Sequence, residues 1–248
     1  MKGCIAVFDS GVGGLSVLKP LTQLLPFEDF VYFADNLHVP YGNKPFEEVK
    51  NYLFRSIEKI LACQPKAVVI ACNTATSLFI DDLRKTYPDE LFFGVQPAVK
   101  PAAKFGNCLT LVTAATSKNK NFLALCDKYA NGYAFVYPLP DAARLIENNV
   151  SDEELEKYIK DALEGVILSN FSTAVLGCTH YSLRKKVFEK ALGNLPVMDG
   201  NVSLAKYVKK RLTELKLTNN AKLKGSVSFV LSNPETKEFL KYISLFNF

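Results

Sequence analysis

The chain contains no hydrophobic run near 18 residues and no N-terminal apolar segment behind a basic flank. Neither a membrane span nor a secretion signal is therefore predicted, and we expect a cytoplasmic protein. Its six cysteines lack any regular spacing. The chain has 248 residues, and 48% of them are hydrophobic, which is sufficient for a substantial core. In a chain of this length, irregularly spaced cysteines indicate reduced thiols and not a disulfide framework.

The glycine patterns of nucleotide-binding proteins are also missing. The segment DSGVGG at 9–14 has neither the spacing of a dinucleotide fingerprint nor the lysine of a P-loop. The net charge of +5 comes partly from basic residues at 185–186 and 209–211, which are typical of a solvated helix face, so we expect no nucleic-acid partner. DSGVGG is then either a tight strand-to-helix turn or a ligand site that the backbone approaches closely.

Short apolar runs alternate with helical patterns along the chain, which indicates an α/β fold with mainly parallel sheets. The helical periodicity is clearest over 151–169, where Ser151 and Glu154 form a capping box. Prolines 97 and 101 mark a break, at which we place a domain boundary. The predicted strands span 4–8, 30–34, 67–71, 91–95, 109–112, 134–137, 174–177 and 227–231.

Two similar cysteine turns follow two of these apolar runs. The first, ACNTA, occupies 71–75, and the second, GCTHY, occupies 177–181. Because ligands bind at the carboxyl ends of strands in open α/β sheets, we expect both sulfurs at such an edge. Helix N-terminal amides there attract a carboxylate and favour a thiolate. A pair of opposed thiols is suited to catalysis by two bases, one on each side of a substrate.

Two further strand exits extend the pattern. The loop PYG at 40–42 is expected to form a wall of the cleft. TAATSK at 113–118 offers hydroxyls and amides to a carboxylate, although alone it is typical of a helix cap.

The blocks DSGVGG, PYG, ACNTA and GCTHY resemble, in order and spacing, the signatures of the glutamate racemase family. The similarity extends over 5–199.

This resemblance implies a fold and an assembly. Members of the family have two Rossmann-like, pseudo-symmetric domains that face each other across a cleft, and the active site lies in this interdomain cleft. On this chain the first domain would comprise 1–97 plus 207–248, and the second would comprise 98–206. The family needs no cofactor, and the resemblance implies a homodimer; we also expect no metal ion.

The resemblance also implies a reaction, the cofactor-independent racemisation of L-glutamate and D-glutamate, which supplies D-glutamate for peptidoglycan synthesis. Inversion at Cα means removing a proton from one face and returning one to the other, so one base must be a thiolate while its partner is a thiol. An ordinary thiol has a pKa of about 8.5, and two thiols in one anionic site titrate as a coupled pair. A bell-shaped pH profile is expected.

By the same resemblance, Cys72 is the base for the D enantiomer and Cys178 the base for the L enantiomer. Asp9 assists proton transfer near Cys72, and His180 assists near Cys178. Glu147 is either a further acidic helper beside His180 or an exposed helical acid. The residues expected to bind the substrate, together with Asp9 and His180, are Ser10, Tyr41, Gly42, Asn73, Thr74, Thr113, Thr116 and Thr179.

Three alternatives stay open. The first keeps the fold but acts on another acidic amino acid such as aspartate, on a hydantoin, or in a decarboxylation, which would need one thiol only. The second is a carboxylate-binding thiol sensor without enzymatic activity. The third is a metal site at Cys178 and His180, but zinc wants three or four ligands, and Cys72 with Asp9 would have to complete the set. His38 is not expected to be catalytic.

Overall fold

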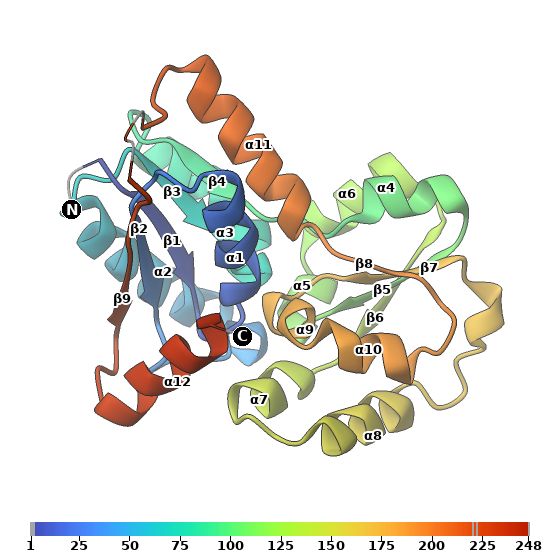
Figure 1. Cartoon of the computed structure of the whole chain (residues 1–248). Coiled ribbons are helices and arrows are strands. Elements are labelled where there is room, and N and C mark those ends of the chain that lie inside the picture. The colour runs from blue at the N-terminus through green and yellow to red at the C-terminus, as the bar shows by residue number, and fades with distance from the viewer. Residues whose placement is uncertain (1–2, 220, 222, 248) are drawn as a thin grey trace.

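The computed structural model describes residues 3–219, 221 and 223–247 and contains two parallel β-sheets (Figure 1). The first sheet has five strands in the order β4-β3-β1-β2-β9, and the second has four in the order β6-β5-β7-β8. Strand pairing is parallel in both sheets, which confirms the predicted α/β class. The strands are β1 (Ile5–Asp9), β2 (Phe30–Ala34), β3 (Ala67–Ile70), β4 (Phe92–Gly94), β5 (Cys108–Val112), β6 (Ala134–Pro138), β7 (Thr173–Leu176), β8 (Val197–Met198) and β9 (Val227–Leu231).

Helices follow most of these strands and pack on both faces of the sheets (Figure 1). In the part of the chain that the structure describes, none has the length and hydrophobicity needed to cross a membrane. The α-helices are α1 (Leu15–Leu24), α2 (Phe46–Leu61), α3 (Asn73–Thr86), α4 (Val99–Ala102), α5 (Ala114–Ser117), α6 (Lys120–Ala130), α7 (Ala142–Glu147), α8 (Asp152–Ala162), α9 (Thr179–Leu183), α10 (Lys185–Ala191), α11 (Asn201–Glu214) and α12 (Thr236–Asn247).

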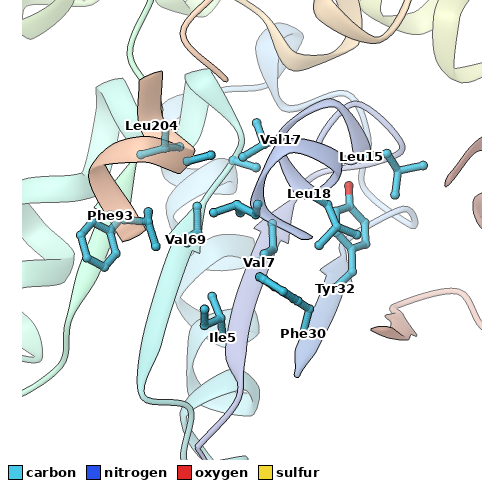
Figure 2. Close-up of a cluster of buried hydrophobic side chains, with 14 of the residues drawn as sticks. Ile5, Val7, Leu15, Val17, Leu18, Phe30, Tyr32, Val69, Phe93 and Leu204 are labelled. Carbon is cyan, nitrogen blue, oxygen red and sulfur yellow. The ribbon is translucent and has the colours of Figure 1, made fainter. Parts of the chain in front are cut away.

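The central strands β1, β2 and β3 of the first sheet are buried on both faces, as their continuous apolar runs predict, whereas the edge strand β9 is partly exposed. Along β1, Ile5 and Val7 lie in the cluster that includes α1 and α11, whereas Ala6 and Phe8 lie in the cluster that includes α2 and α3. This alternation is the two-residue period of a strand. Figure 2 shows Val7 among side chains of α1 such as Leu18. Each such buried side chain contributes about 1.5–3 kcal/mol to folding.

The C-terminal segment returns to the first sheet (Figure 1). Strand β9 pairs with β2, with Phe30 opposite Val227, and α12 buries Tyr242 against Tyr32 at a ring distance of 6.0 Å. Leu204 of α11 also lies in the core beside this sheet. The division into 1–97 plus 207–248 and 98–206 stays a prediction, and its residues 1–2, 220, 222 and 248 lie outside the described residues.

Two sequence predictions need correction. The helix predicted over 151–169 begins as expected, with Ser151 Oγ accepting a hydrogen bond from the Glu154 amide at 3.1 Å, but α8 ends at Ala162. Gly165 has φ +82°, a left-handed conformation that the helix cannot include. Strand β8 was not predicted, because two residues are too few for an alternating pattern to be recognised. The other eight strands were predicted within one or two residues of their observed ends.

Candidate functional site

Both predicted cysteine turns lie where a strand passes into a helix. Cys72 follows β3 and is the N-cap of α3, and Cys178 follows β7 and is the N-cap of α9. Each is 5% exposed. The hydroxyl exit at Thr113 has the same form, because it follows β5 and caps α5. The two thiols therefore come from corresponding edges of two different sheets.

The Cys72 thiol is buried and has two polar neighbours. Its sulfur is 3.5 Å from the Ala75 amide, which donates to it, and 3.8 Å from Ser10 Oγ. Burial raises the pKa of Cys72 to about 12, with a contribution from the charge of Asp9, while the Ala75 amide acts in the opposite direction. Cys178 adds to this rise in the Cys72 pKa, so the two thiols share one electrostatic environment. The helix amide favours the thiolate as expected, but burial outweighs it.

Asp9, at the end of β1, is fully buried and connects the two sheets. Its Oδ1 accepts from the Gly11 amide at 2.9 Å, and its Oδ2 accepts from the Thr179 hydroxyl at 3.0 Å. Burial raises the pKa of Asp9 to about 6, although the nearby His180 charge opposes this. A carboxyl group with such a pKa can take up and release protons close to neutral pH.

His180 and Glu147 form a buried ion pair next to Cys178. The distance from His180 Nε2 to Glu147 Oε2 is 2.7 Å. Burial lowers the pKa of His180, but hydrogen bonds with Cys178 and Glu147 outweigh it and raise the pKa to about 10. Burial likewise opposes ionisation of Glu147, yet His180 and Lys241 bring its pKa down to about 2. Glu147 is 7% exposed, so it is not the exposed helical acid of the alternative interpretation.

Threonine hydroxyls form a second connection between the sheets. Thr74 Oγ1, at the start of α3, is 3.1 Å from Thr113 Oγ1, which lies 3.0 Å from Thr116 Oγ1. A Cβ added at Gly42 would lie 2.5 Å from Thr113 Cβ, so the PYG loop also reaches this group. Asn73 is buried beside Thr74 at the first position of α3.

The remaining predicted residue, Tyr41, lies in the same buried cluster as Cys72, but its hydroxyl has another partner. Its ring is buried, and its hydroxyl donates to Asp35 Oδ2 at 2.6 Å and not to any of the other predicted site residues. His38 contacts the same carboxylate through Nδ1 at 2.8 Å and stacks on Tyr52. Within the described ranges, no group of three or more His, Cys, Asp or Glu side chains is arranged to hold a metal ion.

The glycines of DSGVGG permit close contact between the two halves of the site. A Cβ on Gly13 would lie 2.6 Å from the backbone nitrogen of His180, and one on Gly11 would collide with Glu147 Oε2. Real Cβ atoms essentially never come so close. The segment therefore does more than turn the chain after β1, because its backbone packs directly against the residues beside Cys178.

Comparison with known proteins identifies the family of this chain. The sequence pattern of the Asp/Glu/Hydantoin racemase family matches residues 32–208, more than half of the chain. This chain belongs to the Asp/Glu/Hydantoin racemase family. It is 40% identical over 243 residues to glutamate racemase of Clostridium novyi (strain NT), covering 96% of this chain and 94% of that protein. It is 39% identical over 239 residues to glutamate racemase of Clostridium botulinum (strain Alaska E43 / Type E3), covering 94% and 93%.

The fold of a solved member agrees as well. The crystal structure of glutamate racemase from Francisella tularensis subsp. tularensis SCHU S4, in complex with D-glutamate, matches with a TM-score of 0.87 at 25% identity. The match covers 100% of this chain and 94% of that one. The resemblance drawn from the four sequence blocks is thereby confirmed, and so is the prediction of an enzyme of the isomerase class.

Sequence reasoning missed two contacts of this racemase-family site. Lys241 of α12 lies 2.9 Å from Glu147 Oε1, and Tyr32 of β2 donates its hydroxyl to the Gly11 carbonyl at 2.6 Å. No sequence signal distinguishes Lys241 from the other lysines of the chain, because Glu147 lies 94 residues away. Tyr32 was included in a predicted strand, but the sequence pattern does not show which group its hydroxyl contacts.

Proposed function

We propose that this chain interconverts L-glutamate and D-glutamate without a cofactor, using Cys72 and Cys178 as its two bases. The observation that supports this best is the placement of the two buried thiols, on strand ends of different sheets, in one electrostatic environment. Such an arrangement is suited to a substrate bound between the sheets, with one sulfur on each side of its Cα. Family membership and the relatives' names support glutamate as the substrate.

The proton balance of the proposed reaction is simple. One thiolate takes the Cα proton, and the electron pair is delocalised into the adjacent α-carboxylate. The opposite thiol then gives its proton to the other face of Cα, so the enzyme ends with the two protonation states exchanged. We assign Cys72 to the D enantiomer and Cys178 to the L enantiomer, in keeping with the family resemblance. The amides and hydroxyls near both thiols would hold the substrate carboxylates.

Asp9 and the His180–Glu147 pair supply different environments to the two thiols. The charge of Asp9 raises the pKa of Cys72, which makes its thiolate a stronger base once formed. His180 is held as an imidazolium by Glu147, and its hydrogen bond with Cys178 places a positively charged donor beside that sulfur. We therefore propose that Asp9, His180 and Glu147 all assist catalysis, with Asp9 acting on Cys72 and the His180–Glu147 pair acting on Cys178.

Substrate contacts are proposed for the residues that surround the thiols. Their hydroxyl, amide and backbone groups are buried and lie at strand exits of both sheets, as a site for a small dicarboxylate requires. Tyr41 is proposed to act through its backbone, because its hydroxyl is engaged by Asp35. The set comprises Asp9, Ser10, Tyr41, Gly42, Asn73, Thr74, Thr113, Thr116, Thr179 and His180.

The wider biological statements are also proposals. We infer a cleft between a first domain, 1–97 plus 207–248, and a second, 98–206, with the chain acting as a homodimer that provides D-glutamate for peptidoglycan. A cytoplasmic location is supported by six free cysteines in the described residues, which suit a reducing compartment. Racemisation of aspartate is the second candidate, because a shorter dicarboxylate offers the same groups to the same thiols.

The experiment that tests this function is a racemisation assay on glutamate and aspartate with each cysteine replaced in turn. Cys72→Ala and Cys178→Ala should each reduce the rate by about 10²–10⁴-fold, since each removes one of the two proton-transferring groups. Cys63→Ala, a thiol outside the site, is the matched control and should keep native activity. Full activity in both site variants would refute the mechanism, and activity confined to aspartate would reassign the substrate.

A further inference from the structure

We propose that Lys241, on the C-terminal helix α12, is a positioning residue that holds Glu147 and thereby keeps His180 in place beside Cys178. This inference rests on the proposed function of the two thiols. It extends the site to a helix that carries none of the cysteine turns and belongs to the segment after β9.

The two oxygens of Glu147 have separate partners. Oε2 lies 2.7 Å from His180 Nε2 and accepts from the Val12 amide at 3.0 Å. Oε1 lies 2.9 Å from Lys241 Nζ. A carboxylate fixed at both oxygens cannot rotate without losing one of these bonds, so Lys241 fixes the orientation in which Oε2 meets His180.

Helix α12 is itself anchored close to the site. Tyr242, the next residue, is fully buried, and its ring lies 6.0 Å from that of Tyr32, which donates its hydroxyl to the Gly11 carbonyl. Among the described residues, the Tyr242 hydroxyl has no hydrogen-bond partner. The core therefore determines the position of Lys241, which is only 22% exposed.

The charges around Glu147 come from several elements. His180 on α9 and Lys241 on α12 are the cations that lower the pKa of Glu147, while Asp9 on β1 is an acid whose own pKa Glu147 raises. Lys241 is also 3.6 Å from Glu238 on its own helix. The tyrosines whose pKa Glu147 raises are Tyr32 on β2 and Tyr242 on α12. With acids and phenols nearby, removal of the Lys241 charge leaves Glu147 less firmly ionised and free to turn.

The first test observes His180 directly. The chain has two histidines, so imidazole N–H signals in a ¹H–¹⁵N spectrum can be assigned with a single His38→Gln variant. The native protein should give a His180 Nε2–H signal that exchanges slowly with solvent, because this proton is buried and bonded to Glu147. Lys241→Met should raise that exchange rate about tenfold or more, and Lys241→Arg should restore it.

The second test measures catalysis. The enantiomers of glutamate are equally stable, so kcat/KM must change equally in both directions. We expect Lys241→Met to lower it about tenfold and Lys241→Arg to recover most of the loss, since a charged hydrogen bond at a partly exposed side chain is removed and restored. Lys237→Met, an exposed lysine on the same helix, is the control and should match the native protein. Lys241→Gln, which keeps a hydrogen-bond donor without the charge, replaces the methionine variant if that one does not fold.

An unchanged His180 Nε2–H exchange rate in a folded Lys241→Met protein would overturn the inference, as would kcat/KM within twofold of native. If the native protein does not racemise glutamate at all, the proposed function fails instead. The histidine signal still tests the positioning role in that case, because it does not depend on turnover.

Discussion

At the scale of single residues, burial of the Asp9 carboxylate lowers the stability of the folded protein. Burial raises its pKa to about 6 from an ordinary 3.8. A carboxyl whose folded pKa is raised binds more protons in the folded state between pH 4 and 6, so the free energy of unfolding falls as pH rises through this window. Above pH 6 the penalty persists in full. A group retained at such a cost is typical of a functional site.

Asp9→Asn should therefore stabilise the protein at pH 8 while lowering racemisation. The amide keeps an acceptor for the Gly11 amide but avoids burying a charge, and we expect a gain of about 2 kcal/mol in the free energy of unfolding. The gain should vanish near pH 4, where native Asp9 is protonated. Urea unfolding at pH 4 and pH 8 measures it. A variant that is less stable than native at pH 8 would contradict this account.

His180 has the opposite dependence on pH. Its contacts with Cys178 and Glu147 raise its pKa from 6.5 to about 10, so they contribute stability that is complete below pH 6.5 and is lost as pH rises toward 10. We expect the native protein to lose about 5 kcal/mol of unfolding free energy over this range. Glu147→Gln should reduce that loss by at least half, as measured by urea unfolding at pH 6, 8 and 10. An equally steep pH dependence in the variant would argue against the ion pair.

At the scale of elements, the turn from β1 into α1 sets how closely the two sheets approach. Gly13 faces the backbone nitrogen of His180, which cannot move aside as a flexible side chain can. Gly13→Ala should cost about 1–3 kcal/mol of stability and also reduce racemisation, because it separates Asp9 from Thr179.

Gly132→Ala is the control for this prediction. It lies at φ +89° with nothing within 4 Å of the added Cβ, so it should cost about 1 kcal/mol through backbone strain alone and leave activity unchanged. Thermal unfolding and the racemisation assay measure both effects. If Gly13→Ala behaves like Gly132→Ala, the turn does not set the approach of the sheets.

The elements also show which parts of the structure the sequence could predict. The strands before Cys72 and Cys178 were predicted because a short apolar run followed by a capping turn is a local pattern. The bond between Asp9 and Thr179 spans 170 residues, and that between Glu147 and Lys241 spans 94, so both depend on how the sheets pack together. Burial decided the interpretation of Glu147, which the helical pattern alone had left between an exposed acid and a site residue.

At the scale of the whole molecule, the proposed reacting groups are enclosed. Cys72 and Cys178 are each 5% exposed, and Asp9 and His180 are buried with them. The hydrogen bonds from Thr74 to Thr113 and from Thr179 to Asp9 join the two sheets around these groups. On the proposed function, we expect glutamate to enter when the halves carrying the two sheets separate, because both thiols are almost completely buried, and to favour the closed arrangement once bound.

Thiol labelling tests this enclosure. Iodoacetamide should modify the partly exposed Cys63 first, and Cys72 and Cys178 more slowly, as followed by mass spectrometry of peptides. Added glutamate should slow labelling of Cys72 and Cys178 further without affecting Cys126, a buried thiol outside the site. Equal labelling of both site thiols with and without glutamate would contradict the proposed binding between the sheets.

The most direct test of the two-thiol mechanism is racemisation of L-glutamate in D₂O by the purified protein without any added cofactor. Because the opposite thiol carries a solvent deuteron, the D-glutamate formed first should contain deuterium at Cα, while the remaining L-glutamate stays protiated. Chiral separation with mass spectrometry at low conversion distinguishes the two pools. D-glutamate that retains the original proton would indicate a single base, and an absence of D-glutamate would contradict racemisation itself.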